Sequence, residues 1–185
     1  LCASRTQPLI FLHTSFLLSR MTLEEKIGQL LMVSIPGTVL TPETVTKLQQ
    51  YHIGGVFLRG DNVRSESQIK KFTHQLHEEL QGEQHIPFLI ATDQEGGIVS
   101  RFRFLREQTR QSEVHDAAHA FEIGLQRGKE LRALGIDINF APVLDVAAST
   151  SDYMYTRTFR GDEKRVATLG VGIIQGYHAG GILAV

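Results

Sequence analysis

Acidic side chains in this sequence follow short apolar runs that predict buried strands. Asp93, Gln94 and Glu95 come directly after the run 87–92, and two glycines come next. Glycine lets the backbone approach a ligand closely, and a carboxylate at a strand tip can accept hydrogen bonds from adjacent hydroxyls. These residue types in this order favour a site that recognises the hydroxyl groups of a sugar.

The same residues allow a structural interpretation. Asp93 could instead cap the turn after its strand, because aspartate side chains readily accept from turn amides. Arg101 and Arg157 could donate to the same sugar hydroxyls or lie on the surface. Asn139 and Asp145 close a further predicted strand region. Spacing alone does not decide between these alternatives.

The sequence lacks the motifs of several other kinds of active site. His115 and His119 stand four residues apart, but the glutamate of H-E-x-x-H and a third ligand are missing, so a solvated helix face is favoured. His74 and His77 receive the same interpretation. No G-x-G-x-x-G, P-loop or G-x-S-x-G pattern occurs. We therefore expect no metal, no cofactor and no serine nucleophile.

The composition is that of a single globular domain. The 185 residues are 42% hydrophobic and 21% charged, which is enough apolar side chain for a core. The formal net charge of −1 argues against binding to nucleic acid through bulk charge. No stretch reaches the roughly 20 apolar residues of a membrane span. The single cysteine, Cys2, excludes a disulfide scaffold.

The first twenty residues differ from the rest. Residues 9–18 read LIFLHTSFLL, an apolar segment that His13, Thr14 and Ser15 interrupt and that no small-x-small cleavage site follows. We predict a leader or a disordered terminus over residues 1–20. A cytoplasmic location is favoured, with secretion or a lipoprotein as the alternative if the segment is a leader remnant.

Helices and short apolar strands alternate from residue 22 onward. The predicted strands cover residues 31–35, 56–58, 87–92, 136–140 with 143–146, and 182–185. Helices are expected to begin after Thr22, Thr41, Ser65 and Asp162, and a long helix is expected over 114–134, with Val114, Ala118, Phe121, Leu125, Gly128, Leu131 and Leu134 on one face. This alternation demands parallel strands with helical crossovers. A barrel and an open doubly wound sheet both satisfy it.

Five sequence blocks carry a resemblance to a known family. They are MTLEEKIGQLLMV (21–33), IGGVFL (53–58), DQEGGIVSR (93–101), LRALGIDINFAPVLDV (131–146) and RTF (157–159). In this order they resemble the N-terminal barrel domain of glycoside hydrolase family 3, and the Asp-Gln-Glu-Gly-Gly form resembles its β-N-acetylglucosaminidase (β-N-acetylhexosaminidase) branch. The resemblance implies an α/β fold, a partial (β/α)8 TIM-type barrel with about five of eight units, over residues 21–185. A complete barrel usually takes about 250 residues.

The resemblance also implies roles for individual residues. Asp93 matches the aspartate that binds sugar hydroxyls, Arg101 ends the same motif, and Arg157 matches an arginine that holds the sugar in the first subsite. Glu95 and Asp145 are expected to shape the site. Two departures affect this region: Ile98 stands where the family usually has Arg, and no proline lies between residues 87 and 142.

The family's catalytic groups have no matching position. A Lys-His-Phe-Pro-Gly-His block follows a strand similar to residues 181–185 in the family, and the acid/base pair and the nucleophilic aspartate come later still. A retaining glycosidase needs both groups flanking the scissile bond. We therefore expect no catalytic residue in these 185 residues.

Three functions are consistent with these motifs. The first is a retaining β-N-acetylglucosaminidase acting on terminal β-linked GlcNAc from peptidoglycan or chitin-derived sugars, of which this chain lacks the catalytic residues. The second is a non-catalytic sugar-binding remnant of the same fold. The third is an unrelated α/β enzyme whose strand-end acids bind a divalent cation. The expected partner is a carbohydrate, and five of eight strands would leave sheet edges through which the chain could self-associate.

Overall fold

A computed structural model describes residues 15–80 and 86–185. Five strands form one parallel sheet, β1 (Met32–Ser34), β2 (Gly55–Leu58), β3 (Leu89–Thr92), β4 (Ile138–Asn139) and β5 (Leu183–Ala184). Their spatial order is β1-β2-β3-β4-β5, the order of the chain. A doubly wound sheet reverses its strand order at a switch point, whereas a barrel adds each strand beside the last. The order therefore supports the predicted partial barrel.

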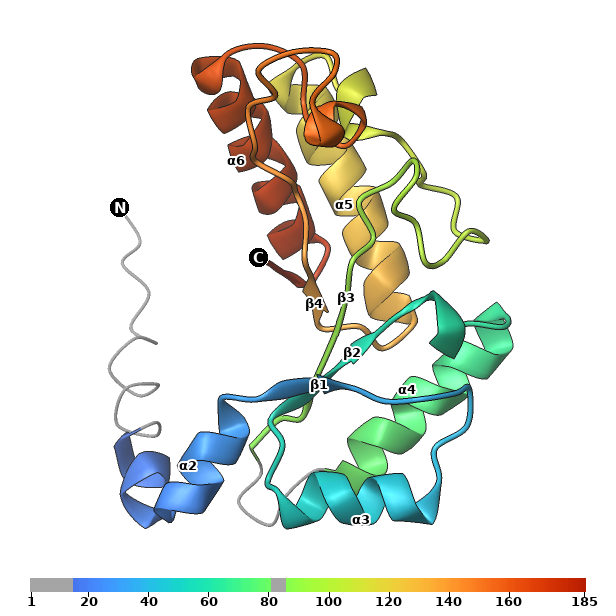
Figure 1. Ribbon diagram of the computed structural model, residues 1–185, viewed down its shortest axis with the longest axis vertical. Helices are drawn as coiled ribbons and strands as arrows, with labels where there is room; N and C mark the ends of the chain where they lie inside the picture. Colours follow the sequence, from blue (N-terminus) through green and yellow to red (C-terminus); the bar gives the residue numbers. More distant parts are fainter. Residues whose placement is uncertain (1–14, 81–85) are drawn as a thin grey trace.

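Helices separate the strands, as the sequence pattern predicts (Figure 1). They are α2 (Leu23–Gln29), α3 (Pro42–Gln50), α4 (Glu66–Leu80), α5 (Ala117–Ala133) and α6 (Glu163–Ala179), with short 3-10 turns η1 (Gly60–Asn62), η2 (Gln111–Glu113) and η3 (Tyr153–Thr156). The core between the helices and the sheet contains Val56, Leu58 and Ile90 from the strands. Helix α4 contributes Ile69, Phe72 and Leu76.

The helix starts predicted from caps are confirmed, whereas the helix expected from residue 114 begins at Ala117. Thr22 and Glu25 form a reciprocal capping box at α2, and Thr41 caps α3 ahead of Pro42. Asp162 accepts a hydrogen bond from the Arg165 amide and caps α6. Each cap satisfies amides that have no partner within the helix, so residues close in the chain determine where these helices begin.

The buried face of α5 differs from the prediction. Residues Ala120, Ile123, Gly124, Arg127, Gly128 and Leu131 are buried within this helix, whereas Ala118 is exposed and Phe121 and Leu125 are only partly buried. The prediction was right for Val114, Gly128, Leu131 and Leu134, which are buried, and it missed Ile123, Gly124 and Arg127. The helix is rotated so that its glycines meet α6: a Cβ on Gly124 would lie 2.2 Å from the Ile173 carbonyl oxygen. Such close contact requires glycine.

The fourth strand is also shorter than predicted. β4 ends at Asn139, and residues 143–146 form no strand. Pro142 has no amide to donate to a ladder, and the Val143 amide donates instead to the Gln111 side chain (N–Oε1 2.8 Å). Asp145 therefore lies in a loop and is exposed.

The described helices include none that is long and apolar enough to cross a membrane. Residues 1–14, which hold most of the predicted leader, lie outside the described residues, and residues 15–20 are helical. The leader stays a prediction.

Candidate functional site

The candidate site lies where β3 ends. Asp93 follows the last residue of β3, and Gly96 and Gly97 turn the chain back with positive φ angles of 87° and 65°. The Glu95 amide closes this turn by donating to the Val99 carbonyl oxygen at 2.9 Å. A Cβ on Gly96 would lie 2.1 Å from the Thr109 carbonyl oxygen, so no other residue fits. The two glycines thus allow a second loop segment to lie directly against the strand tip.

Asp93 and Arg101 form a two-pronged ion pair. Arg101 Nε donates to Asp93 Oδ1 at 2.6 Å, and Arg101 Nη2 donates to Oδ2. Hydrogen bonding to Asp93 raises the pKa of the Arg101 guanidinium, and burial opposes this with a smaller lowering. Both side chains keep partial contact with solvent, at 20% for Asp93 and 32% for Arg101, so a ligand can reach them. The carboxylate binds an arginine, in contrast to the turn-capping alternative.

Glu95 and Arg157 form a second, more buried pair. Arg157 Nε donates to Glu95 Oε2 at 2.9 Å, and Nη2 donates to Oε1. The hydrogen bond to Glu95 raises the pKa of Arg157, while burial lowers it by less. Arg157 follows η3, 62 residues after Glu95, and the fold brings the two together. The charges of Glu95 and Arg157 also act on Arg101, which places the two ion pairs near one another.

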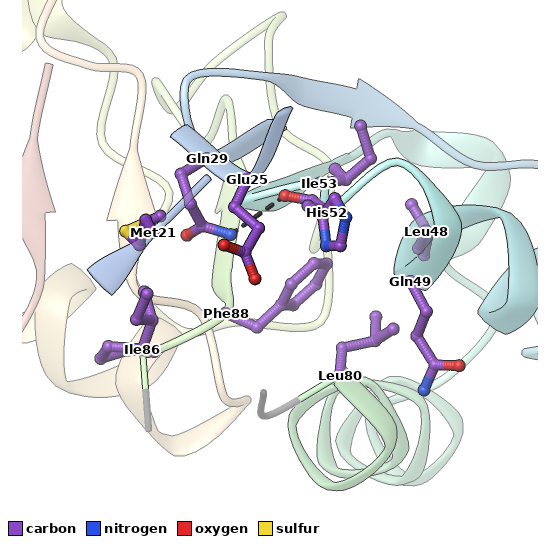
Figure 2. A pocket seen from close by; sticks show the side chains of 11 residues that line it. Met21, Glu25, Gln29, Leu48, Gln49, His52, Ile53, Leu80, Ile86 and Phe88 are labelled. Carbon is purple, nitrogen blue, oxygen red and sulfur yellow. Dashed lines mark hydrogen bonds between the residues drawn. The ribbon is translucent and has the colours of Figure 1, made fainter. Parts of the chain in front are cut away.

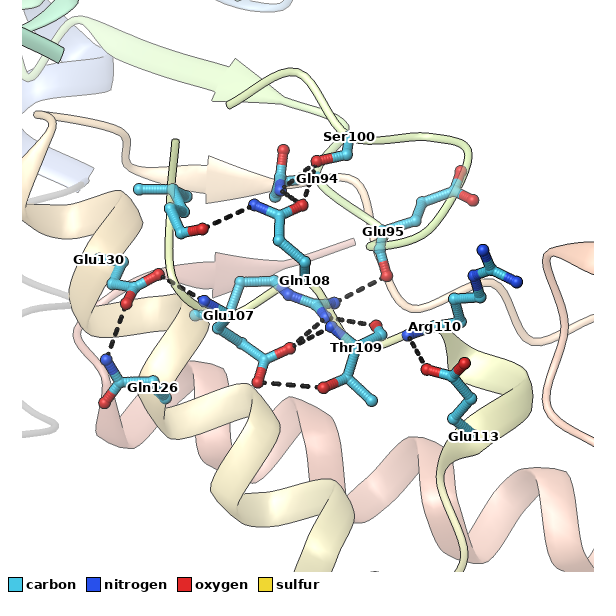
Figure 3. Close-up of polar contacts among 12 residues, drawn as sticks. Gln94, Glu95, Ser100, Glu107, Gln108, Thr109, Arg110, Glu113, Gln126 and Glu130 are labelled. Carbon is cyan, nitrogen blue, oxygen red and sulfur yellow. Dashed lines mark hydrogen bonds and ion pairs between the residues drawn. The ribbon is translucent and has the colours of Figure 1, made fainter. Parts of the chain in front are cut away.

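Gln94, between the two acids, makes four side-chain hydrogen bonds within the loop, and Figure 3 shows it beside Ser100 and Gln108. Its Oε1 accepts from the backbone amides of Arg101 and Phe102 at 2.8 and 3.0 Å. Its Nε2 donates to Ser100 Oγ at 2.8 Å and to Gln108 Oε1 at 3.3 Å. Gln94 is fully buried, so these bonds replace water entirely. It fixes the backbone of the residue that binds Asp93.

Asn139 holds the strand tip from the neighbouring strand. Its Oδ1 accepts from the Gln94 amide at 2.8 Å, and its Nδ2 donates to the Gln94 carbonyl oxygen at 3.0 Å. This reciprocal contact extends the parallel pairing of β3 with β4 past the last strand residue. The sequence pattern placed Asn139 at a strand end and gave it no role.

The structure does not bring every predicted site residue together. It pairs Asp93 with Arg101 and Glu95 with Arg157, and the two carboxylates lie two residues apart after β3. Asp145 is exposed, and within the described residues its carboxylate accepts no hydrogen bond. Its predicted contribution to the shape of the site stays a prediction.

Arg127 is a site residue that the sequence motifs did not reveal. It is fully buried and donates to the Glu95 carbonyl oxygen at 2.8 Å. A signal for it was present, because Arg127 stands four residues from both Ile123 and Leu131 on a buried helix stripe. A charged residue in such a stripe needs a specific partner.

A hollow that does not contain the two ion pairs lies at the amino-terminal end of the strands, opposite the candidate site (Figure 2). It has a volume of about 440 Å³ and is lined from α2, α3 and the segments that lead into β2 and β3. Ligand sites in parallel α/β folds lie at the carboxyl ends of the strands. The two ion pairs are at that end, so they define the candidate site, and the hollow does not.

The two ion pairs suit ligand binding rather than catalysis. Each carboxylate faces a guanidinium, so neither is left free to transfer a proton or attack a carbon. The two pairs offer fixed donors and acceptors in one place, an arrangement that suits a neutral polyhydroxyl ligand. Within the described ranges, no three His, Cys, Asp or Glu side chains gather as metal ligands.

Comparison with known proteins agrees with this geometry. Residues 22–185 match the model of the glycosyl hydrolase family 3 N terminal domain. A β-hexosaminidase of Methylobacillus flagellatus is 36% identical over 165 residues, which cover 84% of this chain and 46% of that protein. The chain therefore belongs to glycoside hydrolase family 3, and it spans about half the length of the curated relatives it matches.

Solved structures show the same fold. A family 3 β-N-acetylglucosaminidase from Paenibacillus sp. str. FPU-7 superimposes with a TM-score of 0.82 at 31% identity, over 89% of this chain and 32% of that one. NagZ from Neisseria gonorrhoeae, in complex with N-trifluoroacetyl-D-glucosamine, gives 0.74 at 28% identity, over 83% of this chain and 48% of that one. The resemblance and the fold class expected from the sequence are confirmed, the latter as five parallel strands alternating with helices.

Proposed function

We propose that the site after β3 binds a terminal, β-linked GlcNAc residue of a peptidoglycan or chitin-derived sugar. The paired geometry of Asp93–Arg101 and Glu95–Arg157 carries this proposal, because each arginine holds its carboxylate in a fixed position. A preformed site loses little conformational entropy on binding. The relative that binds N-trifluoroacetyl-D-glucosamine supports the same class of ligand.

The protein to which this sequence contributes is, in this proposal, a retaining β-N-acetylglucosaminidase. Such an enzyme needs a nucleophile and an acid/base group on the two sides of the glycosidic bond. Among the described residues both site carboxylates are neutralised by arginines, so these residues supply binding and orientation of the sugar. The β-hexosaminidase names of the matched relatives support this assignment.

A second function, sugar binding without turnover, follows from the same ion pairs. Saturation transfer NMR with GlcNAc measures binding, and release of nitrophenol from a nitrophenyl β-N-acetylglucosaminide measures turnover. Millimolar binding without turnover supports a binding role for the 185 residues, whereas absence of binding contradicts both functions. Glucose is the matched control sugar, since it lacks only the acetamido group.

Self-association through the sheet is part of the proposal. β1 and β5 are the outer strands of the described sheet, and Leu183 on β5 is 53% exposed. Unpaired strand edges with apolar side chains promote pairing with another chain. Light scattering should show a mass that rises with concentration, and a monomer at all concentrations would contradict this expectation.

A further inference from the structure

Arg127 on α5 is the most completely buried charge among the described residues. Its side chain is 1% exposed, and its two terminal nitrogens bind four acceptors. Nη1 donates to the Glu95 carbonyl oxygen at 2.8 Å and to the Tyr177 hydroxyl at 3.2 Å. Nη2 donates to the Thr109 carbonyl oxygen at 2.8 Å and to Glu107 Oε1 at 3.0 Å. Burying a charge is costly unless such partners are present.

Three of the four acceptors of Arg127 come from two separate parts of the candidate site. One is the backbone of Glu95, whose carboxylate binds Arg157. Two more are Glu107 and Thr109, in the segment that lies against Gly96, and the fourth acceptor, the Tyr177 hydroxyl, lies on α6 outside the site. The Arg127 guanidinium therefore contacts the turn after β3 at Glu95 and the loop segment at Glu107 and Thr109. It also contacts α6 at Tyr177. Figure 3 shows this meeting of the loop segment and the turn above the helices.

The contacts favour arginine over any other cation. The guanidinium is planar and presents donors in several fixed directions, whereas an ammonium group is a compact point charge. Burial lowers the pKa of Arg127, but the nearby Tyr177 and Glu107 outweigh this and raise it, so the group stays charged. Arg127 Nε has no acceptor in the part of the chain that the structure describes, so the four contacts of the terminal nitrogens determine where the side chain lies.

We infer that Arg127 is a positioning residue of the sugar site, acting through Glu95 on Arg157. This inference rests on the proposed sugar-binding function and extends it to a residue that touches no ligand. Arg127 holds the Glu95 backbone from which the side chain extends, and the Glu95 carboxylate binds the Arg157 guanidinium. Glu107 forms an ion pair with Arg127, and its negative charge offsets the cost of burying the guanidinium. We therefore treat Arg127 and Glu107 as one functional pair.

The test compares four variants of the full chain. Arg127→Met removes the donors at similar volume, Arg127→Lys keeps the charge, and Glu107→Gln removes the counter-charge. Ile123→Ala, at a buried position one helical turn away, is the control for general loss of stability. Two quantities are measured: the ¹⁵N–¹H signal of Arg157 Nε, assigned with Arg157→Lys, and the Kd for GlcNAc.

Arg127→Met should shift the Arg157 Nε signal, speed its hydrogen exchange and raise the Kd for GlcNAc roughly tenfold, because small displacements of a positioning group have large effects on a preformed site. Glu107→Gln should act in the same direction, and Arg127→Lys should restore part of the affinity. Ile123→Ala should leave the Arg157 signal in place and the Kd within about twofold of wild type.

An unchanged Arg157 signal in folded Arg127→Met would overturn the inference, and so would an equal change in Ile123→Ala. Should Arg127→Met fail to fold, the same criterion applies to Glu107→Gln. Absence of GlcNAc binding by the wild-type chain would contradict the proposed function instead. The Arg157 signal needs no sugar, so the two failures are distinguishable.

Discussion

Residues 93–116, between β3 and α5, and residues 140–162, between β4 and α6, both leave the carboxyl edge of the sheet and return to a helix. In the first loop, Gln94 makes four side-chain hydrogen bonds to other residues of the same loop. The second loop contributes Arg157 to the site and leaves Asp145 exposed. Asp93 and Arg101 are therefore paired within the first loop, whereas Glu95 is held by Arg127 on α5 and by Arg157 in the second loop.

Gln94→Leu should have the largest effect, because it removes the centre of the first loop. The amides of Arg101 and Phe102 would lose their acceptor, and a buried unsatisfied amide costs about 1–3 kcal/mol. We expect the free energy of unfolding to fall by about 3 kcal/mol in chemical denaturation, with GlcNAc binding lost. Gln126→Leu, at an exposed glutamine of α5 that contacts Glu130, is the control. Equal losses in both variants would refute the central role of Gln94.

Arg157→Ala should have the next largest effect and tests the link between the loops. It leaves the Glu95 carboxylate, whose side chain is 4% exposed, without its ion-pair partner. Because Arg157 is partly exposed, we expect the cost of an unsatisfied acceptor, a loss of about 2 kcal/mol in the free energy of unfolding, and a Kd for GlcNAc raised about tenfold. Arg103→Ala, at an exposed arginine of the first loop, should change neither quantity. Wild-type affinity in Arg157→Ala would exclude this residue from the site.

A smaller effect is expected at the aspartates that end the two loops. Asp116 caps α5 by accepting from the His119 amide at 2.8 Å, and this bond lowers the pKa of the Asp116 carboxyl. A carboxyl with a lowered folded-state pKa stabilises the fold above its unfolded pKa, about 3.9, and loses that contribution as the pH falls through the folded value. Asp116→Ala should therefore be less stable than wild type at pH 7, and the difference should shrink on acidification below about pH 4.

Thermal unfolding at pH 7 and at pH 3 measures this difference. Asp162→Ala, which removes the matching cap of α6, serves as the comparison at the end of the second loop. A difference between Asp116→Ala and wild type that is the same at both pH values would show that the cap does not act through its charge.

Asp145→Ala should have the smallest effect. The side chain is exposed and accepts no hydrogen bond within the described residues, so its loss leaves no buried group unsatisfied. We expect the melting temperature and the Kd for GlcNAc to match those of wild type. A loss of affinity comparable to that of Asp93→Ala would mean that the second loop shapes the site through more than Arg157.

The sequence predicted the features that depend on neighbouring residues. The caps at Thr22, Thr41 and Asp162 are local, and all are present. The face of α5 was predicted only in part, because close contact with α6 at Gly124 and Gly128 sets the orientation of the helix. Which face of a helix is buried against a distant helix cannot be read from neighbouring residues alone.

The candidate site shows the same difference between contacts of residues close in the sequence and contacts of distant residues. Asp93 and Arg101 lie eight residues apart and were singled out from one motif. Their direct ion pair was not predicted, because spacing does not show where a side chain points. The partners of Glu95 lie 32 and 62 residues away, at Arg127 and Arg157, so only the folded chain reveals them.

Titration of GlcNAc into wild-type chain and into Asp93→Ala, followed by calorimetry or ligand-observed NMR, tests the assignment of the sugar site most directly. We predict saturable binding to wild type that glucose does not reproduce, and at least a roughly tenfold weaker interaction with Asp93→Ala in a chain that still folds. Equal binding to both chains, or none to wild type, would contradict a sugar site at the end of β3.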